Sequence, residues 1–204
     1  MRNAFARAVT ELAANQPDLV LLTGDIGNRL FDRFKERYPN RFYNCGVAEA
    51  GMTGIAGGLA ASGLRPITYT ITPFNTVRCL EQIRLDICYP DYPVVVVGTG
   101  AGLSYASLGA SHHSMEDIGL LRMLPNMHVV CPGDTIEVEL AVRAAYEHKK
   151  PTYIRLGKKG EPRVHEVIPD FQIGRGIVLQ EGEDIALLAV GNMLPVARDV
   201  VRQL

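Results

Sequence analysis

The sequence predicts an α/β protein built on a parallel sheet of about six strands, with helices on both faces. Two observations support this prediction. Short apolar runs alternate along the chain with longer segments in which apolar residues recur at helical spacing. The short runs are also apolar throughout rather than at every second position, which is typical of strands that are buried on both faces of a parallel sheet.

In chain order the expected elements are a helix over 2–15, a strand over 19–25, a helix over 48–62, a strand over 65–71, a helix around 75–88, a strand over 92–98, a short helix over 115–124, a strand over 127–134, a helix over 135–148 and a strand over 151–156. The strands coincide with apolar runs such as VVVV, which lies between Pro93 and Gly98. In the helix over 48–62, one apolar stripe is formed by Met52, Ile55 and Leu59.

The helical and strand patterns are lost over residues 158–173, where lysine, proline and glycine accumulate, so we expect a linker there. Apolar runs return within 174–204, in DIALLAVGN and LPVARDVVRQL, which predict one more strand and one more helix. A single unit of this kind cannot bury both faces of a sheet. We therefore expect a main domain over 1–157 and a truncated second domain over 174–204.

Composition excludes several classes of protein. Apolar residues make up 47% and charged residues 21%, the balance of a globular domain, and the net charge of −1 gives no basic field for nucleic acid or an anionic membrane. The apolar runs are too short to span a bilayer, and the amino terminus lacks the apolar core of a signal peptide. The cysteines are widely spaced, which favours reduced thiols in a cytoplasmic protein over disulfides or a zinc site.

Polar candidates gather where ligands bind in parallel sheets, at the carboxyl ends of the strands. They are Asp25, Glu49, Arg155 and the glycine-rich loop over 99–114. The loop lacks the third glycine and the following helix of a dinucleotide-binding fingerprint. Its serines lack the strand-to-helix turn that presents a hydrolase nucleophile. We expect no metal ligands on this chain, since the adjacent His112 and His113 point in different directions.

Glu49 lies in the segment GVAEAGM, among glycine, alanine and other apolar residues. An acidic residue in the first turn of a helix most often interacts favourably with the helix dipole. The alternative is a buried acid that holds or donates a proton. The residues alone leave both interpretations open.

Three blocks of sequence, in order along residues 2–157, resemble the pyrimidine-binding domain of the transketolase family of thiamine diphosphate enzymes. The blocks are GVAEAGMTGIAGGLAASGLRPI, EQIRLDICYP and GASHHSMEDIGLLRMLPNMHVVCPGD. The tail from FQIGRGIVL resembles the start of the family's carboxyl-terminal domain. The resemblance implies the thiamine diphosphate-binding pyrimidine-domain fold and thiamine diphosphate as the cofactor.

The resemblance also implies roles for individual residues. Glu49 matches the glutamate that hydrogen-bonds ring nitrogen N1′ of the cofactor's aminopyrimidine, and a carboxyl group shielded by small residues can share a proton with that ring. Phe74 matches the aromatic residue that packs on the pyrimidine. Ile71 stands where the family often has a second aromatic residue, and Asp25 matches an aspartate near the thiazolium ring.

His112 matches a histidine that contacts substrate hydroxyl groups, and Arg155 matches an arginine that holds a sugar phosphate. Two positions depart from the family pattern. Leu108 replaces an aspartate that contacts the substrate, and Gly100 replaces a phosphate-binding histidine. The donor could therefore be an unusual keto sugar or a 2-oxo acid.

The family's diphosphate- and Mg²⁺-binding domain, with its Gly-Asp-Gly signature, has no counterpart in this sequence. The resemblance thus implies the beta-type subunit of a split transketolase, which forms a homodimer or hetero-oligomer and works with a separate subunit that supplies the Mg²⁺ ligands. Alternatives are a 2-oxo acid decarboxylase or dehydrogenase beta subunit, an enzyme like 1-deoxyxylulose-phosphate synthase, or a non-catalytic assembly subunit. The last is disfavoured, because an assembly subunit has no need of a buried acid at Glu49.

Overall fold

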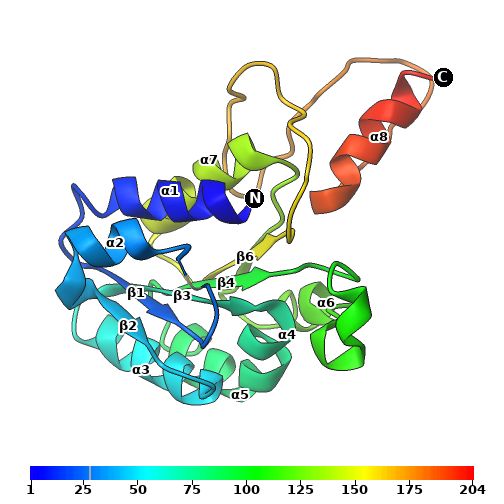
Figure 1. Cartoon of the computed structure of the whole chain (residues 1–204). Helices are drawn as coiled ribbons and strands as arrows, with labels where there is room; N and C mark the ends of the chain where they lie inside the picture. The colour runs from blue at the N-terminus through cyan, green and yellow to red at the C-terminus, as the bar shows by residue number, and fades with distance from the viewer. Residues whose placement is uncertain (28) are drawn as a thin grey trace.

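A six-stranded parallel sheet forms the centre of the protein in the computed structural model, which describes residues 1–27 and 29–204 (Figure 1). The strand order is β2-β1-β3-β4-β6-β5, and every neighbouring pair is parallel. This confirms the predicted fold class. The strands are β1 (Leu19–Thr23), β2 (Phe42–Asn44), β3 (Arg65–Ile71), β4 (Val95–Thr99), β5 (His128–Val130) and β6 (Thr152–Leu156).

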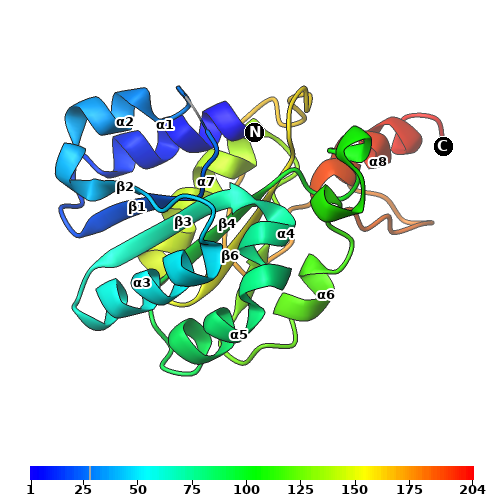
Figure 2. The ribbon, with the colours of Figure 1, turned by 60° about the horizontal axis from the view of Figure 1, so that its bottom comes forward.

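Helices cover both faces of this sheet. On one face lie α1 (Arg2–Leu12), α2 (Asp32–Arg37) and α7 (Thr135–His148). On the other lie α3 (Glu49–Ala61), a π-helix (Ile83–Cys88) and α6 (Asp117–Leu121), along the side that Figure 2 turns forward. Shorter helices are α4 (Thr72–Asn75) and α5 (Leu80–Gln82), and α8 (Leu194–Val201) stands apart near the carboxyl terminus.

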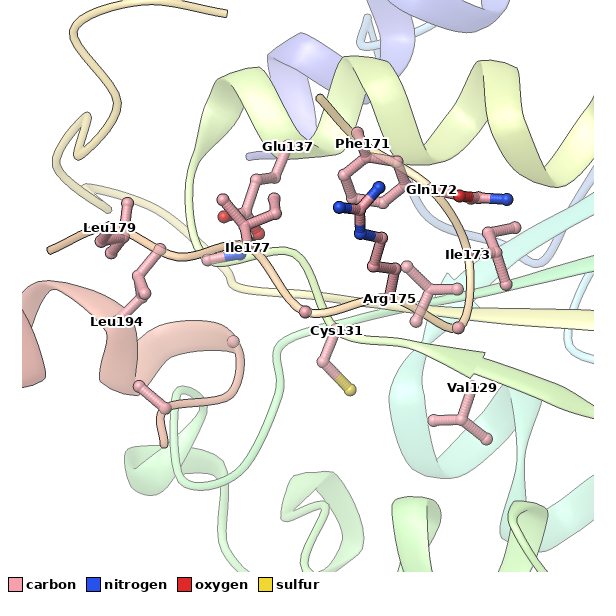
Figure 3. Close-up of a pocket in the computed structure, with 16 residues that line it drawn as sticks. Val129, Cys131, Glu137, Phe171, Gln172, Ile173, Arg175, Ile177, Leu179 and Leu194 are labelled. Atoms are coloured by element: carbon pink, nitrogen blue, oxygen red, sulfur yellow. Dashed lines mark hydrogen bonds between the residues drawn. The ribbon is translucent and has the colours of Figure 1, made fainter. Parts of the chain in front are cut away.

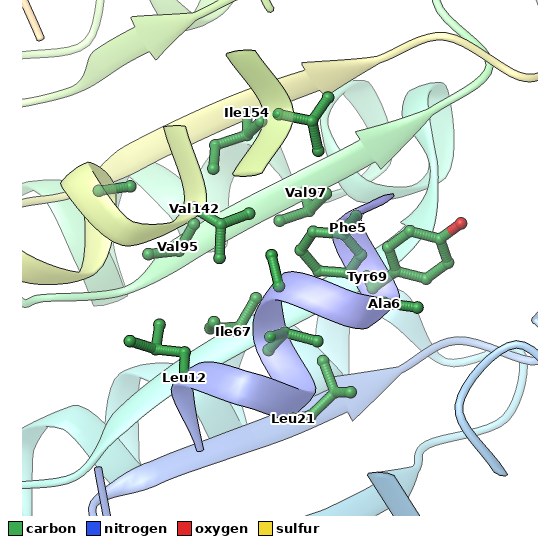
Figure 4. Close-up of a cluster of buried hydrophobic side chains, with 14 of the residues drawn as sticks. Phe5, Ala6, Leu12, Leu21, Ile67, Tyr69, Val95, Val97, Val142 and Ile154 are labelled. Atoms are coloured by element: carbon green, nitrogen blue, oxygen red, sulfur yellow. The ribbon is translucent and has the colours of Figure 1, made fainter. Parts of the chain in front are cut away.

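Two apolar cores result, one on each face, because successive side chains of a strand point to opposite sides. In β1, Leu19 and Leu21 belong to the first core, whereas Val20 and Leu22 belong to the second. Figure 4 shows the first core, where α1 packs on the strands and Phe5 stacks on Tyr69 with ring centroids 5.2 Å apart. The strands are therefore apolar throughout because both of their faces are buried, as the sequence indicated.

The structure corrects four details of the predicted elements. Residues 26–47, for which no element was predicted, contain α2 and the edge strand β2. The expected helix around 75–88 is broken at Thr76, whose φ of −128° and ψ of −80° are not helical. On α3, Ile55 is 52% exposed, and the buried stripe instead follows small residues such as Ala56 and Ala60.

The fourth correction concerns the tail, where the expected strand within DIALLAVGN does not form. In the part of the chain that the structure describes, residues 184–190 are in neither a strand nor a helix, whereas the expected helix is present as α8. Ile185, Leu187 and Leu188 are exposed. A strand needs a neighbour for its backbone N–H and C=O groups, and this segment has none within the described residues. Residues 185–204 lie outside the main sheet, as predicted.

None of the helices among the described residues is long and apolar enough to cross a membrane. The four cysteines are free, with Cys79 and Cys88 buried and Cys45 and Cys131 partly buried.

Candidate active site

Glu49 is the first residue of α3, and its side chain is buried at the carboxyl ends of β1 and β3. The carboxylate reaches back over the strands at Gly24, directly after β1. A Cβ atom at Gly24 would lie 3.6 Å from Glu49 Oε1 and 2.8 Å from Thr70 Oγ1. The approach to Thr70 is so close that a side chain at position 24 would force Thr70 to shift. Glu49 Oε1 would lie at ordinary van der Waals distance from the same Cβ atom.

Arg78 contacts both this carboxylate and the Phe74 ring. Its Nη1 donates a hydrogen bond of 2.6 Å to Glu49 Oε2, and its guanidinium carbon lies 4.2 Å from the centroid of the Phe74 ring. The break at Thr76 makes this possible, because it places Phe74 and Arg78 on separate short turns at the end of β3. An acid, an aromatic face and a planar cation thus meet at one point.

His112 also lies against Phe74, and their ring centroids are 5.0 Å apart. The sequence-predicted residues Glu49, Phe74 and His112 are therefore brought together, although 63 positions separate the first from the last (112 minus 49). Ser111 Oγ lies 3.0 Å from His112 Nδ1, and the Tyr105 ring centroid is 5.8 Å from that of His112.

The structure accounts for Gly100, one of the two departures from the family pattern. Gly100 has a φ of +86°, and a Cβ atom there would lie 2.0 Å from the Tyr105 ring. Tyr105 therefore fills the space that a side chain at position 100 would need. Lys158, which directly follows Gly157 beyond β6, holds its ammonium group 4.2 Å from the Tyr105 ring centroid.

Asp25 and Ile71 lie at the same edge of the sheet. Asp25 is exposed, its backbone N–H donates to Gly46 O at 3.1 Å, and Asn44 Nδ2 donates to its Oδ1 at 3.5 Å. These contacts tie it to the segment that leads into Glu49. Ile71 is the last residue of β3 and is 8% exposed, so it is largely covered within the chain.

Arg155 also reaches this edge, but protein groups already bind its guanidinium. Nε donates to Asp117 Oδ2 at 2.7 Å, and Nη2 donates to Ser114 O at 3.0 Å. Burial opposes the charge of Arg155, but the hydrogen bonds to Asp117 and its negative charge outweigh this and raise the pKa of the guanidinium. The role of Arg155 as a phosphate ligand stays a prediction.

The pocket in Figure 3 is a different region of the molecule. It has a volume of about 290 Å³ and lies between the end of β5, the start of α7 and residues 171–179. Cys131, Glu137 and Arg175 are among its lining residues, whereas Glu49, Phe74 and His112 are not. We place the candidate site at Glu49 because titratable, aromatic and cationic groups converge there at the ends of the strands.

Comparison with known proteins shows the family of the chain. The family model described as the pyrimidine-binding domain of transketolase matches residues 1–162. The chain belongs to this family. Among curated relatives, one of the subunits of an apulose-4-phosphate transketolase from Phocaeicola vulgatus is 34% identical over 94% of this chain. The 1-deoxy-D-xylulose-5-phosphate synthase of Desulfotalea psychrophila is 34% identical over 92% of it.

Among solved structures, one described as a split-gene transketolase, an inactive beta4 tetramer, is 38% identical and superposes with a TM-score of 0.88 over 99% of this chain. The chain spans 62% of the length of the Phocaeicola protein, 30% of the Desulfotalea synthase and 66% of the split-gene structure. The family and the fold thus agree with what the sequence resemblance implies.

Sequence reasoning missed three groups of this site, namely Arg78, Tyr105 and Lys158. For Arg78 helical spacing gave no usable signal, because the chain leaves the helical conformation at Thr76, between Phe74 and Arg78. Lys158 was assigned to the linker on composition. Nothing local indicates that Tyr105 fills the space beside Gly100, since that contact depends on the path of the loop.

Proposed function

We propose that this chain is the beta-type subunit of a thiamine diphosphate-dependent transferase of the transketolase type. It moves a two-carbon ketol unit from a keto sugar to an aldehyde sugar. The observation that carries the proposal is the convergence of Glu49 and Phe74 on one planar N–H donor. The guanidinium of Arg78 lies on the Phe74 ring and donates to the Glu49 carboxylate.

An aminopyrimidine ring can make the same two contacts as this guanidinium. It is planar, presents an N–H group when it is protonated at N1′, and stacks on aromatic rings. The residues present therefore suit the cofactor, with Glu49 at N1′ and Phe74 on the ring face. For the pyrimidine to bind there, Arg78 must release Glu49, and its exposure of 43% leaves it free to do so.

Thiamine diphosphate, when bound, would supply a carbanion that adds to a carbonyl carbon and so allows the adjacent carbon–carbon bond to break. The task of Glu49 is to hold a proton at N1′, where burial excludes competing water. We assign His112 to the substrate hydroxyl groups, since it lies beside Phe74. Asp25 and Ile71 line the same edge, where we expect them near the cofactor.

A separate subunit completes the site in this proposal. It carries the diphosphate-binding domain and the Mg²⁺ ligands. Its contact surface would include the outer face of α3, where Cβ atoms at Gly51 and Gly58 would meet no atom within 4 Å and Ile55 is half exposed. The small residues allow another helix to approach closely. The Phocaeicola relative, described as one subunit of a transketolase, and the inactive beta4 tetramer support an assembly of more than one chain.

The test is Glu49→Gln in the complex with a diphosphate-binding subunit. Glutamine keeps the shape and a hydrogen bond but cannot supply the proton. We expect the cofactor still to bind, while exchange of its C2 proton for deuterium slows by at least about 10²-fold, the lower end of general acid–base contributions. Glu81→Gln is the matched control, since Glu81 is exposed in the first turn of α5. An unchanged exchange rate for Glu49→Gln would refute the proposal.

A second candidate is 1-deoxyxylulose-phosphate synthesis, favoured by the match to the Desulfotalea enzyme. The two activities differ in the donor. A synthase of that type condenses a decarboxylated 2-oxo acid with an aldose phosphate, whereas a transketolase takes its two carbons from a ketose. Turnover of the complex with a 2-oxo acid but not with a ketose would favour the second candidate.

A further inference from the structure

Arg155 lies at the carboxyl end of β6, and its guanidinium faces α6. It contacts Asp117 through two nitrogens, with Nε 2.7 Å from Oδ2 and Nη2 3.3 Å from Oδ1. The Asp117 side chain is 1% exposed and that of Arg155 is 16% exposed. Two contacts between a planar fork and a carboxylate fix the orientation of both groups. Water therefore has little access to this ion pair.

Tyr153, two residues earlier on β6, completes the network around the carboxylate. Its hydroxyl group donates to Asp117 Oδ2 at 2.6 Å and is fully buried. Burial and the nearby Asp117 carboxylate keep the pKa of Tyr153 well above the usual value, so the hydroxyl remains a donor. Asp117 thus receives hydrogen bonds from two residues of β6, and this compensates for burying its charge.

The same guanidinium also contacts the base of the loop that carries His112. Nη2 donates to Ser114 O at 3.0 Å, and Ser114 N–H in turn donates to Gly102 O at 3.0 Å. A Cβ atom at Gly102 would lie 3.9 Å from Arg155 Nη2. The two ends of loop 102–114 therefore meet directly against Arg155. His112 lies in this loop, two residues before Ser114.

We propose that Arg155 is a positioning residue that, together with Asp117, holds the base of loop 102–114 and thereby keeps His112 beside Phe74. This role replaces the phosphate contact that the family resemblance implies for Arg155. Asp117 and Ser114 O already occupy Nε and Nη2, so a phosphate could reach only Nη1 unless it drew the guanidinium away from the buried carboxylate of Asp117. The consequence for catalysis rests on the proposed function, whereas the structural role does not.

The structural role is tested on the isolated chain by hydrogen–deuterium exchange of the amides in residues 102–114. We expect faster exchange in this loop for Arg155→Met and Asp117→Asn, with the sheet still protected. Arg122→Met is the matched control, because Arg122 is exposed at the end of α6, and it should leave the loop unchanged. If Arg155→Met does not fold, Arg155→Lys replaces it, since lysine keeps the charge but loses the fork. Unchanged loop exchange in a folded variant would overturn the proposal.

The catalytic consequence is tested in the complex with two donors, a ketose phosphate and the same ketose without phosphate. Misplacing a substrate-contacting group by about 1 Å can cost about 10²-fold in rate. We therefore expect Arg155→Met to lower kcat by up to about that factor for both donors alike, and Arg155→Lys to restore part of it.

A rise in KM confined to the phosphorylated donor, with kcat unchanged, would show instead that Arg155 binds phosphate and would overturn the proposal. If the wild-type complex transfers no ketol unit from either donor, the proposed function fails. The loop exchange then decides the positioning role independently.

Discussion

Two arginine–carboxylate pairs lie at the same edge of the sheet, and they differ in how far water can reach them. In the Glu49–Arg78 pair, one hydrogen bond joins a buried acid to an arginine that is 43% exposed. In the Asp117–Arg155 pair, the carboxylate receives three hydrogen bonds, and the arginine is 16% exposed. Water reaches the arginine of the first pair, whereas protein encloses both members of the second. We call Glu49–Arg78 the open pair and Asp117–Arg155 the closed pair.

This difference separates a binding position from a structural one. Removing one partner from a buried pair costs about 3–5 kcal/mol, because the other charge is left without compensation. Arg78 is 43% exposed, so its guanidinium can move into water while a ligand that donates to Glu49 compensates the carboxylate. Arg155 is 16% exposed and donates to both Asp117 and Ser114, so its release is more costly.

The closed pair provides the strongest test of this comparison. We expect Arg155→Met to lower the free energy of unfolding by about 3–5 kcal/mol. Replacing both partners, in Arg155→Met with Asp117→Leu, should cost less than the sum of the two single changes, because no buried charge remains. Urea unfolding of the four proteins measures this cycle. Strictly additive losses would mean that the two residues act independently.

Asp134 is a buried carboxylate whose hydrogen-bond donors are backbone N–H groups instead of an arginine. It is the N-cap of α7, and its carboxylate accepts from the N–H groups of Ile136, Glu137, Val164 and His165. Burial opposes its ionisation, but these hydrogen bonds prevail and hold the pKa of Asp134 below its usual value of 3.8.

For Asp134→Ala we expect a loss of about 0.5–2 kcal/mol at neutral pH, the usual range for an N-cap. Because the folded-state pKa is lowered, the ionised group stabilises the fold above the unfolded-state pKa, near 3.8, and this contribution is lost as pH falls through the folded-state pKa. The difference between wild type and variant should therefore shrink below about pH 4. Thermal unfolding at several pH values checks this, with Asp170→Ala as an exposed control. A gap that stays constant to low pH would contradict it.

The open pair should give a smaller effect on stability than the closed pair and the clearest effect on binding. We expect Arg78→Met to lower the free energy of unfolding by about 1–3 kcal/mol, the cost of leaving one buried acceptor without a hydrogen bond. The aminopyrimidine half of thiamine should then bind the isolated chain up to about fivefold more tightly, since it no longer competes with the guanidinium. Titration followed by NMR measures this, with Arg122→Met as the control. Weaker binding to Arg78→Met would mean that Arg78 assists the ligand instead of competing with it.

Much of the fold follows from patterns within a few residues. The helix over 135–148 was predicted with its observed bounds, because its helical pattern lies within the segment itself and begins directly after a turn. The edge strand β2 was not predicted, since its three residues are half exposed or exposed and show no apolar run. The strand expected in the tail failed for the opposite reason, because its apolar run finds no strand to pair with among the described residues.

For the candidate site, the local sequence marked Glu49 as an acid among small residues at the start of a helix, whereas its role and that of His112 came from the family resemblance. Local sequence patterns could not predict the groups that surround Glu49 and His112. Glu49 meets Arg78 from 29 residues away, and Asp117 meets Arg155 from 38 residues away. A periodic pattern determines which face of an element is buried. Which charges then meet at the edge of the sheet depends on strand order and on the path of each loop, and these arise from packing between distant segments.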